Sequence, residues 1–230
     1  MFRSTISQQT QLVLKMKLLD LYCKAGGASV GYKQAGFDEV VGVDIKKQKR
    51  YPYQFIQADA LEVLNDMDFL RKFDVIHASP PCQTHSATRH LRNAQGKSTD
   101  KVDLIPQTRE ALQKWASESD GGYYVIENVP GAPLLDPIQI CGSDFNLKVR
   151  RHRLFESNFK LVGTGCKHKE QGRPEGIYGS MRDEIPGGGH TAKTIEQARE
   201  AMGIDWMIWG ELVEAIPPAY TKHIGLQILY

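Results

Sequence analysis

The sequence predicts an α/β protein built on a doubly wound, mostly parallel sheet. Short apolar runs alternate with helix-like segments through the first half of the chain, the pattern of parallel strands joined by crossover helices. The clearest runs end at a glycine turn, an acid or a proline turn, and in open sheets that edge is where ligands bind. With 230 residues, 41% of them hydrophobic, the chain can form one domain with a substantial core and a small appendage.

The first half of the chain supplies four expected strands and two expected helices. We predict strands at residues 17–22, 39–43, 55–57 and 73–78, and helices at 28–35 and 60–70. Gly36 gives the first helix a natural C-terminal stop. The second helix has apolar residues at 60, 61, 63, 64, 67 and 70, a spacing that predicts one buried face.

The second half is less regular. We predict a helix at 104–117, strands at 123–126 and 149–155, an irregular insert at 157–190, and helices at 195–202, 209–215 and 220–229. The segment 84–101 is polar and basic, and a loop of that length is usually functional or disordered. Pro217-Pro218 breaks the chain before the closing helix.

These elements suggest one main domain and three smaller parts. We expect an N-terminal extension at 1–15 without the features of a secretory signal, a main domain at 16–156, a short insert at 157–201 and a returning segment at 202–230. No apolar run approaches the roughly 20 residues that a membrane span needs. A net charge of +2 neither requires nor excludes a polyanionic partner, and four scattered cysteines suit a reducing compartment such as the cytoplasm.

The glycine turn after the first strand has the features of a nucleoside-binding crossover. Gly26-Gly27 joins a strand to a helix, and Asp44 follows about 20 positions later at the end of the next strand, where it can accept hydrogen bonds from ribose hydroxyls. Asp59 follows the third strand and could accept from an adenine amino group. Lys24 and Ser29 replace the outer glycines of the dinucleotide fingerprint, which argues against NAD. The alternative is a tight turn with two solvated aspartates.

The turn after the fourth strand presents a cysteine. Ser79-Pro80-Pro81-Cys82-Gln83 places two prolines directly before Cys82 at the carboxyl end of that strand. A thiol held on a stiff turn at the ligand-binding edge is a candidate nucleophile, whereas a lone cysteine elsewhere is more often an inert packing residue.

Two further strand-end motifs carry charge. Glu127 follows four apolar strand residues, so burial should raise its pKa and suit it to proton donation; the alternative is an ordinary strand-end carboxylate. Strand alternation predicts Arg151 and Arg153 on one face, where two guanidinium groups suit a phosphate or a polar base edge; the alternative is a solvated basic strand.

Taken in order, these motifs resemble the cytosine-C5 DNA methyltransferase family, especially its short phage-encoded members. The resemblance covers most of the chain from Lys17 to Leu229. Its most specific part is Pro81-Cys82-Gln83 followed by Glu127-Asn128-Val129. The remaining motifs are Asp20–Gly27, Asp44, Asp59, Arg151-His152-Arg153 and the stretch from Ala215 to Gly225.

The resemblance implies the Rossmann-like fold of class I methyltransferases, S-adenosylmethionine as cofactor, and double-stranded DNA as the partner of a monomeric enzyme in a bacterial host cytoplasm. Cys82 would attack C6 of a flipped cytosine, Glu127 would act at N3, and Arg153, with Arg151 in support, would hold O2 or a phosphate. The implied cofactor-binding residues are Tyr22, Lys24, Gly26, Gly27, Asp44, Ile45, Asp59, Ala60, Pro81, Glu214 and Ala215.

Four positions depart from the family pattern. Lys24 stands where the cofactor loop usually has glycine, Glu214 where larger members have asparagine, Val149 where glutamine is common, and His85 where an aromatic residue is usual. Lys24 and the short insert keep one alternative open, the same fold acting with a modified methyl donor, on RNA or on a free nucleotide. A second alternative is a non-catalytic nucleic-acid-binding relative, against which the intact set of Cys82, Glu127 and Arg153 argues.

The recognition insert is short and carries basic residues together with a cysteine and histidines. A region of this size suits a short target site. Cys166 and His168, with Cys141 or His190, could bind zinc, but the paired spacing of structural zinc sites is missing, so we predict no metal.

Overall fold

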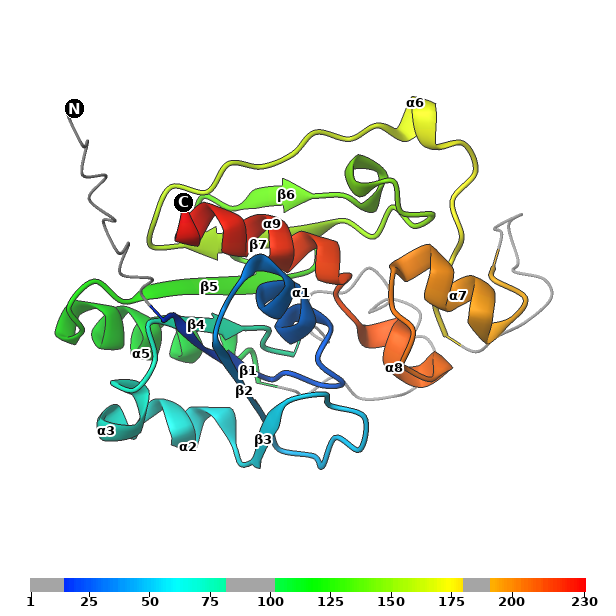
Figure 1. The fold of residues 1–230 in the computed structure, drawn as a ribbon. Helices are drawn as coiled ribbons and strands as arrows, with labels where there is room; N and C mark the ends of the chain where they lie inside the picture. Colours follow the sequence, from blue (N-terminus) through cyan, green and yellow to red (C-terminus); the bar gives the residue numbers. More distant parts are fainter. Residues whose placement is uncertain (1–14, 82–101, 180–190) are drawn as a thin grey trace, which may run out of the picture.

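The computed structural model of this protein describes residues 15–81, 102–179 and 191–230. Its centre is a seven-stranded sheet in the order β3-β2-β1-β4-β5-β7-β6 (Figure 1). Strands β3, β2, β1, β4 and β5 pair in parallel, and β7 runs antiparallel to both of its neighbours, so the prediction of a mostly parallel sheet is confirmed. The strands are β1 Lys17–Leu21, β2 Glu39–Asp44, β3 Gln54–Gln57, β4 Val75–Ala78, β5 Tyr123–Asn128, β6 Ile138–Ile140 and β7 Arg153–Ser157.

Helices cover both faces of this sheet, as Figure 1 shows. Apolar side chains of α2 and α5 form one core with the strands, and those of α1 and α9 form a second core on the opposite face. The helices are α1 Gly27–Ala35, α2 Ala60–Leu64, α3 Met67–Leu70, α5 Ile105–Glu118, α6 His168–Gln171, α7 Ile195–Met202, α8 Trp209–Glu214 and α9 Pro218–Leu229, with a 3-10 turn η1 at Gly142–Phe145. Among the described helices, none has the length and apolar character to cross a membrane.

The register of the parallel strands sets which residues meet at their carboxyl ends. Leu21 pairs with Val43 on one side and with Ala78 on the other, and Ala78 pairs with Ile126. The residue after each pair therefore lies at the same level of the sheet. This rule brings Tyr22, Asp44, Ser79 and Glu127 to one edge, where parallel α/β sheets bind ligands.

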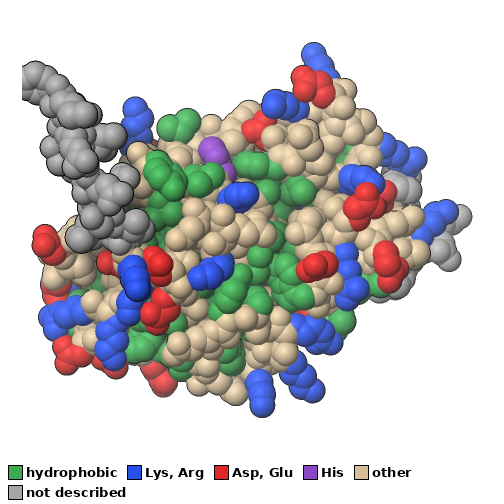
Figure 2. Space-filling view, in the orientation of Figure 1, with side chains coloured by type: hydrophobic (Ala, Val, Ile, Leu, Met, Phe, Trp, Pro, Cys, Tyr) green, Lys and Arg blue, Asp and Glu red, His purple; other side chains and the backbone are tan. Residues whose placement is uncertain are grey.

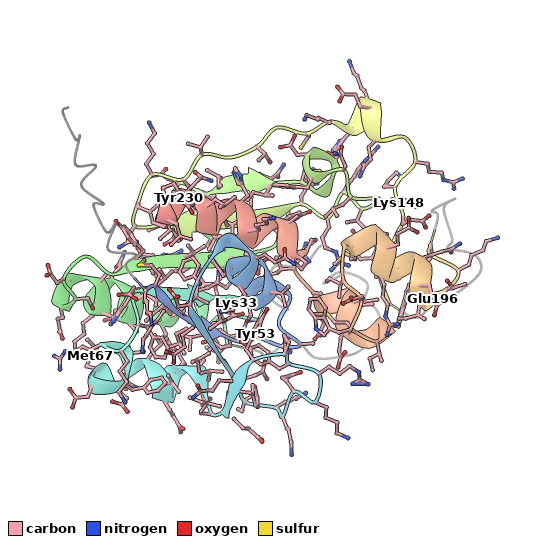
Figure 3. The ribbon with its side chains drawn as sticks, viewed as in Figure 1. Lys33, Tyr53, Met67, Lys148, Glu196 and Tyr230 are labelled. Atoms are coloured by element: carbon pink, nitrogen blue, oxygen red, sulfur yellow. The ribbon has the colours of Figure 1, made fainter. Side chains whose placement is uncertain are left out.

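A third, smaller core lies beside this edge, where Figure 1 shows α7 and α8. The indole Nε1 of Trp206 donates to Ala25 O at 2.8 Å, which ties the α7–α8 unit to the turn after β1. Lys148, labelled in Figure 3, pairs with Glu200 of α7 at 2.6 Å. On the face shown in Figure 2, acidic and basic side chains are interspersed. The expected domain boundaries remain predictions.

Two predicted elements are wrong in their extent. The helix expected at 60–70 is broken into α2 and α3, because the Asp66 side chain accepts from Phe69 N at 3.0 Å and starts a new helix. The strand expected at 149–155 begins only at Arg153, because Arg151 has a left-handed backbone with φ of 35°. The short strand β6 was not predicted, since three residues carry no readable period. The expected extension and the polar segment 84–101 lie outside the described residues.

Candidate active site at the carboxyl edge of the sheet

The turn between β1 and α1 needs its two glycines. Gly26 has φ of +84°, a conformation that only glycine adopts without strain. At Gly27 a Cβ atom would lie 2.3 Å from Ile216 O, so the start of α1 can approach the segment before α9 only without a side chain. Tyr22 and Lys24 also have positive φ, at 59° and 49°. The turn is therefore a tight arch of backbone over the strand edge, mostly buried, with Lys24 exposed.

Asp44 is fixed at the end of β2 with little access to solvent. Its side chain is 4% exposed and accepts from Lys24 N at 3.2 Å and from Lys46 N at 2.9 Å. The next residue, Ile45, is an apolar side chain left 63% exposed. A fixed carboxylate followed by an exposed apolar surface suits a ribose and the flat face of an adenine. The alternative of a solvated aspartate does not hold for Asp44.

Asp59 has a structural task as well as the predicted one. It caps α2 by accepting from Leu61 N at 2.8 Å through Oδ1. The second carboxylate oxygen, Oδ2, is available for a ligand. Ala60, the first residue of α2, is buried behind it.

Asp20 is a buried acid whose role the sequence did not reveal. It is 1% exposed, the Ser29 hydroxyl donates to its Oδ2, and Oδ1 has no hydrogen-bond partner among the described residues. Burial, aided by the nearby carboxylates of Asp44 and Glu127 and opposed by the hydrogen bonds from Ser29, raises its pKa to about 7. Three acids gathered at one edge favour a ligand that carries positive charge.

Lys24 and Glu214 form an ion pair. Lys24 Nζ lies 3.4 Å from Glu214 Oε2, and both side chains are about half exposed, at 48% and 56%. The two residues that depart from the family pattern around the cofactor therefore contact each other. The pair joins the β1–α1 turn to the end of α8, and its charge balance means that Lys24 does not stand as an isolated cation.

Glu127 sits at the end of β5 against Arg153. The carboxylate is buried, and its Oε1 lies 3.0 Å from Arg153 Nε. Burial raises the pKa of Glu127, and the charge of Arg153 together with a hydrogen bond to Ser79 opposes the rise. The result is a carboxyl group oriented by a guanidinium at the same edge as the acids above.

A buried polar chain supports the Pro-Pro turn from below. His77 hydrogen-bonds Tyr32 through Nδ1 and Ser79 through Nε2, each at 3.0 Å, and burial lowers its pKa to about 3, so the ring is neutral. Asn128 donates from Nδ2 to Pro80 O at 3.0 Å. The turn that leads to Cys82 is thus held by both β4 and β5. Pro81 is the last described residue before Cys82, which lies outside the described residues, as does His85.

Arg151 corrects the expectation of two arginines on one strand face. It precedes β7 and is 3% exposed. Its guanidinium donates to three backbone carbonyls, those of Ile177, Val213 and Ala215, at 2.8 to 3.0 Å. Arg153 alone of the two faces Glu127, and Arg151 holds together the segments that surround the site.

The edge fits S-adenosylmethionine. Asp44 and Asp59 offer hydrogen-bond acceptors, and the unpartnered oxygen of Asp20 lies in an acid-rich setting that suits a sulfonium and an ammonium group. The remaining predicted contact residues, Tyr22, Pro81 and Ala215, lie on the turns or strand ends that border this edge. Fold and site together define a class I methyltransferase.

Comparison with known proteins identifies the family. The model for C-5 cytosine-specific DNA methylases matches residues 16–136, more than half of the chain, and the protein belongs to this family. S-adenosylmethionine is the methyl donor of the family, in agreement with the geometry of the edge.

Individual relatives resemble parts of the chain to different extents. M.FnuDI of Fusobacterium nucleatum is 36% identical over 83 residues, 34% of this chain and 24% of that methyltransferase. M.HgiGI of Herpetosiphon aurantiacus is 26% identical over 127 residues, 52% of this chain and 94% of that sequence. The match thus spans about a quarter of M.FnuDI.

Among solved structures, the fold resembles a candidate DNA modification methyltransferase encoded within an E. coli prophage. The TM-score is 0.59 at 16% identity, with 93% of this chain and 99% of the other covered. At that identity the likeness concerns the fold alone.

Proposed function

We propose that this protein transfers a methyl group from S-adenosylmethionine to C5 of cytosine in double-stranded DNA. The observation that carries the proposal is the Glu127–Arg153 pair, buried at 3.0 Å beside the turn that leads to Cys82. The acid-rich edge that suits the methyl donor is continuous with it. Family membership supports DNA as the substrate class.

The proposed reaction divides into binding of the methyl donor, by residues at the ends of β1, β2 and β3, and activation of the base, by residues at the ends of β4 and β5. Asp44 would accept from the ribose hydroxyls, Ile45 would cover the adenine, and Asp59 would accept from its amino group. Gly26 and Gly27 would hold the turn that borders the ligand, because they let it pack closely against Tyr51, Pro52 and Ile216. When bound, S-adenosylmethionine supplies an electrophilic methyl group on a sulfonium.

The base-activating half uses covalent catalysis. The thiolate of Cys82 would form a bond to C6 of cytosine, and the displaced electron pair would raise the nucleophilicity of C5. Glu127 would donate a proton or a hydrogen bond at N3, which stabilises the charge that develops there, while Arg153 fixes the carboxyl group. After methyl transfer a base removes the C5 proton, and the C6–S bond breaks to release Cys82. A stacked cytosine cannot reach the thiol, so the nucleotide would flip out of the duplex.

The test combines product analysis with trapping. Incubation with labelled S-adenosylmethionine and duplex DNA, followed by digestion and mass spectrometry of nucleosides, should yield 5-methylcytosine. DNA containing 5-fluorocytosine should form a covalent adduct that Cys82→Ala abolishes. DNA binding without any methylated nucleoside would instead assign the chain to the non-catalytic alternative.

The same assay separates the remaining alternatives. If RNA or free cytidine nucleotides are methylated and duplex DNA is not, the substrate class would be different, but the assignment of the active site would stand. A modified donor has little support, because Glu214 already balances the charge of Lys24. Turnover with unmodified S-adenosylmethionine would remove that alternative.

A further inference from the structure

A second cluster of reactive side chains lies on the β6–β7 side of the sheet, apart from the edge described above. Cys141 follows β6, His152 immediately precedes β7, Cys166 lies in the segment after β7, and His168 begins α6. One ligand atom from each of the four lies within 4.8 Å of every other. The chain has thus gathered two thiols and two imidazoles from positions up to 27 residues apart.

Two of the separations between ligand atoms are close to the edges of a tetrahedral metal site. Cys141 Sγ lies 3.2 Å from His168 Nε2, and Cys166 Sγ lies 3.4 Å from His152 Nε2. Zinc bonds of ~2.3 Å to sulfur and ~2.0 Å to nitrogen place tetrahedral ligands about 3.3 to 3.8 Å from one another. We propose that Cys141, His152, Cys166 and His168 bind a structural Zn²⁺ ion.

Four protein ligands leave no open coordination position, which distinguishes a structural site from a catalytic one. The donor set of two sulfurs and two nitrogens selects zinc over the oxygen-preferring cations. Cys141 is fully buried at one side of the cluster, while Cys166 is exposed at the other. The ion would therefore enter from the Cys166 side and complete its coordination against the protein interior.

Neighbouring groups already orient the ligands. The Ser143 hydroxyl lies 3.1 Å from Cys141 Sγ and accepts from Lys167 N at 3.0 Å. It thereby positions one ligand directly and fixes the backbone between two others, Cys166 and His168. Hydrogen bonds to coordinating atoms of this kind usually accompany metal sites.

The segment that carries Cys166 and His168 has few apolar contacts that would hold it against the sheet. Helix α6 is four residues long and buries none of its side chains, so apolar packing contributes little to its position. Figure 1 shows this part of the chain as a long connection arching past β6. A metal would bind it to the sheet, and through His152 it would also fix the backbone between Arg151 and Arg153.

A disulfide between Cys141 and Cys166 is the main competitor for the same atoms. Both are free thiols in the structure. A disulfide would use both sulfurs and leave the two imidazoles, whose rings lie 5.1 Å apart, without the partners they now face. The paired sulfur–nitrogen contacts therefore favour the metal.

The decisive experiment measures metal in the full-length protein. Protein expressed with zinc in the medium and purified under reducing conditions should hold about one zinc per chain by mass spectrometry of the elements. Cys166→Ser and His168→Asn should lower the zinc content to near zero. Cys23→Ser and His223→Asn, which change the same residue types elsewhere, should retain it.

Cobalt substitution provides a readout independent of folding yield and of catalysis. After removal of zinc with a chelator, Co²⁺ should produce the intense visible absorption of a tetrahedral site and the near-ultraviolet band of thiolate ligation, both lost in Cys166→Ser. Because Cys166 is exposed, this variant should keep the wild-type circular dichroism spectrum. Wild-type protein without zinc and without the cobalt bands would overturn the proposal. So would a mass lower by two hydrogen atoms in the reduced preparation, the mark of a Cys141–Cys166 disulfide.

Discussion

The carboxyl edge of the sheet and the β6–β7 side gather polar residues by different means. At the edge, parallel strands in register bring the strand-end acids Asp44 and Glu127 to one level, and Asp20 lies buried within β1 close to both. On the β6–β7 side, irregular segments bring together a soft, mostly neutral set of thiols and imidazoles. The first arrangement suits a cationic cofactor and proton chemistry, and the second suits a metal that holds loops in place. The comparison indicates that the carboxyl edge carries the proposed reaction and that the β6–β7 side stabilises the segments around it.

The sharpest test of the chemical side is Glu127→Gln. The amide keeps the shape and can still face Arg153, but it cannot donate a carboxylic proton, so single-turnover methylation should fall by about 10²- to 10⁴-fold. Affinity for S-adenosylmethionine, measured by calorimetry, should change little, because the function proposed for this side chain is to act on the base and not on the donor. Glu62→Gln on the exposed side of α2 is the matched control and should retain full activity. Unchanged turnover in Glu127→Gln would remove this residue from the reaction.

The structural role of Arg151, which holds together the segments around the site, can be tested by its effect on stability. Replacement by alanine leaves three carbonyl oxygens, those of Ile177, Val213 and Ala215, without their donor, and we expect a loss of roughly 3 to 5 kcal/mol in the free energy of unfolding. Urea denaturation measures this loss. Arg50→Ala, which breaks only the more exposed pair with Glu211, should cost about 1 kcal/mol or less.

The two arginines of one motif are therefore expected to separate the two roles. A small loss of stability in Arg151→Ala, combined with a selective loss of activity, would show that Arg151 belongs with Arg153 in the chemistry. The distinction proposed between the edge and its support would then fail at this point.

The sequence predicted which residues lie at the carboxyl edge because strand-end residues can be recognised from a short stretch of sequence. A short apolar run followed by an acid or a proline turn can be read without knowing the partner strands, and parallel pairing then fixes the neighbours of Glu127 and Asp44. Asp20 was named only as the first residue of the cofactor-loop motif, because no pattern in the sequence reveals that an acid inside a strand is buried with an unpartnered oxygen.

Of the four proposed metal ligands, the sequence pointed to Cys141, Cys166 and His168 as possible zinc ligands, but the prediction was that no metal binds, and His152 was not named as a ligand. Their sequence spacing lacks the close pairs of structural zinc sites, and His152 is hidden inside an Arg-His-Arg motif that suggests another role. Arg151 was misplaced for a related reason, since its left-handed backbone breaks the strand alternation on which the prediction depended. Residues that come together from separate loops do so through tertiary packing, and a single sequence does not show which loops will meet.

Asp20 makes the stability of the edge depend on pH. Its pKa is about 7 in the folded protein and 3.8 ordinarily, so between these values the folded state binds a proton that the unfolded state has lost. The stability that this group contributes should therefore be fully present below pH 3.8 and be lost as the pH rises through 7, with a loss of roughly 2 to 3 kcal/mol between pH 5 and pH 8.

Asp20→Asn provides the comparison. Its free energy of unfolding, measured by urea at several pH values, should decline less steeply than that of the wild type over this interval. Asp68→Asn changes an exposed aspartate and should reproduce the wild-type slope. Parallel slopes in wild type and Asp20→Asn would mean that the buried acid remains charged in the folded protein.

The smallest expected effect is at the Lys24–Glu214 pair, which lies on the border of the edge. Both side chains are about half exposed, so their coupling free energy should be at most about 1 kcal/mol and should decrease with added salt. A double-mutant cycle of Lys24→Gly and Glu214→Asn, read as the calorimetric affinity for S-adenosylmethionine, measures it. Glu214→Asn alone leaves an unbalanced lysine and should change affinity more than the double variant, which restores the residues usual in the family. Additive effects would mean that the two substitutions act independently, and Lys24 would then have to be explained by its own contact with the donor.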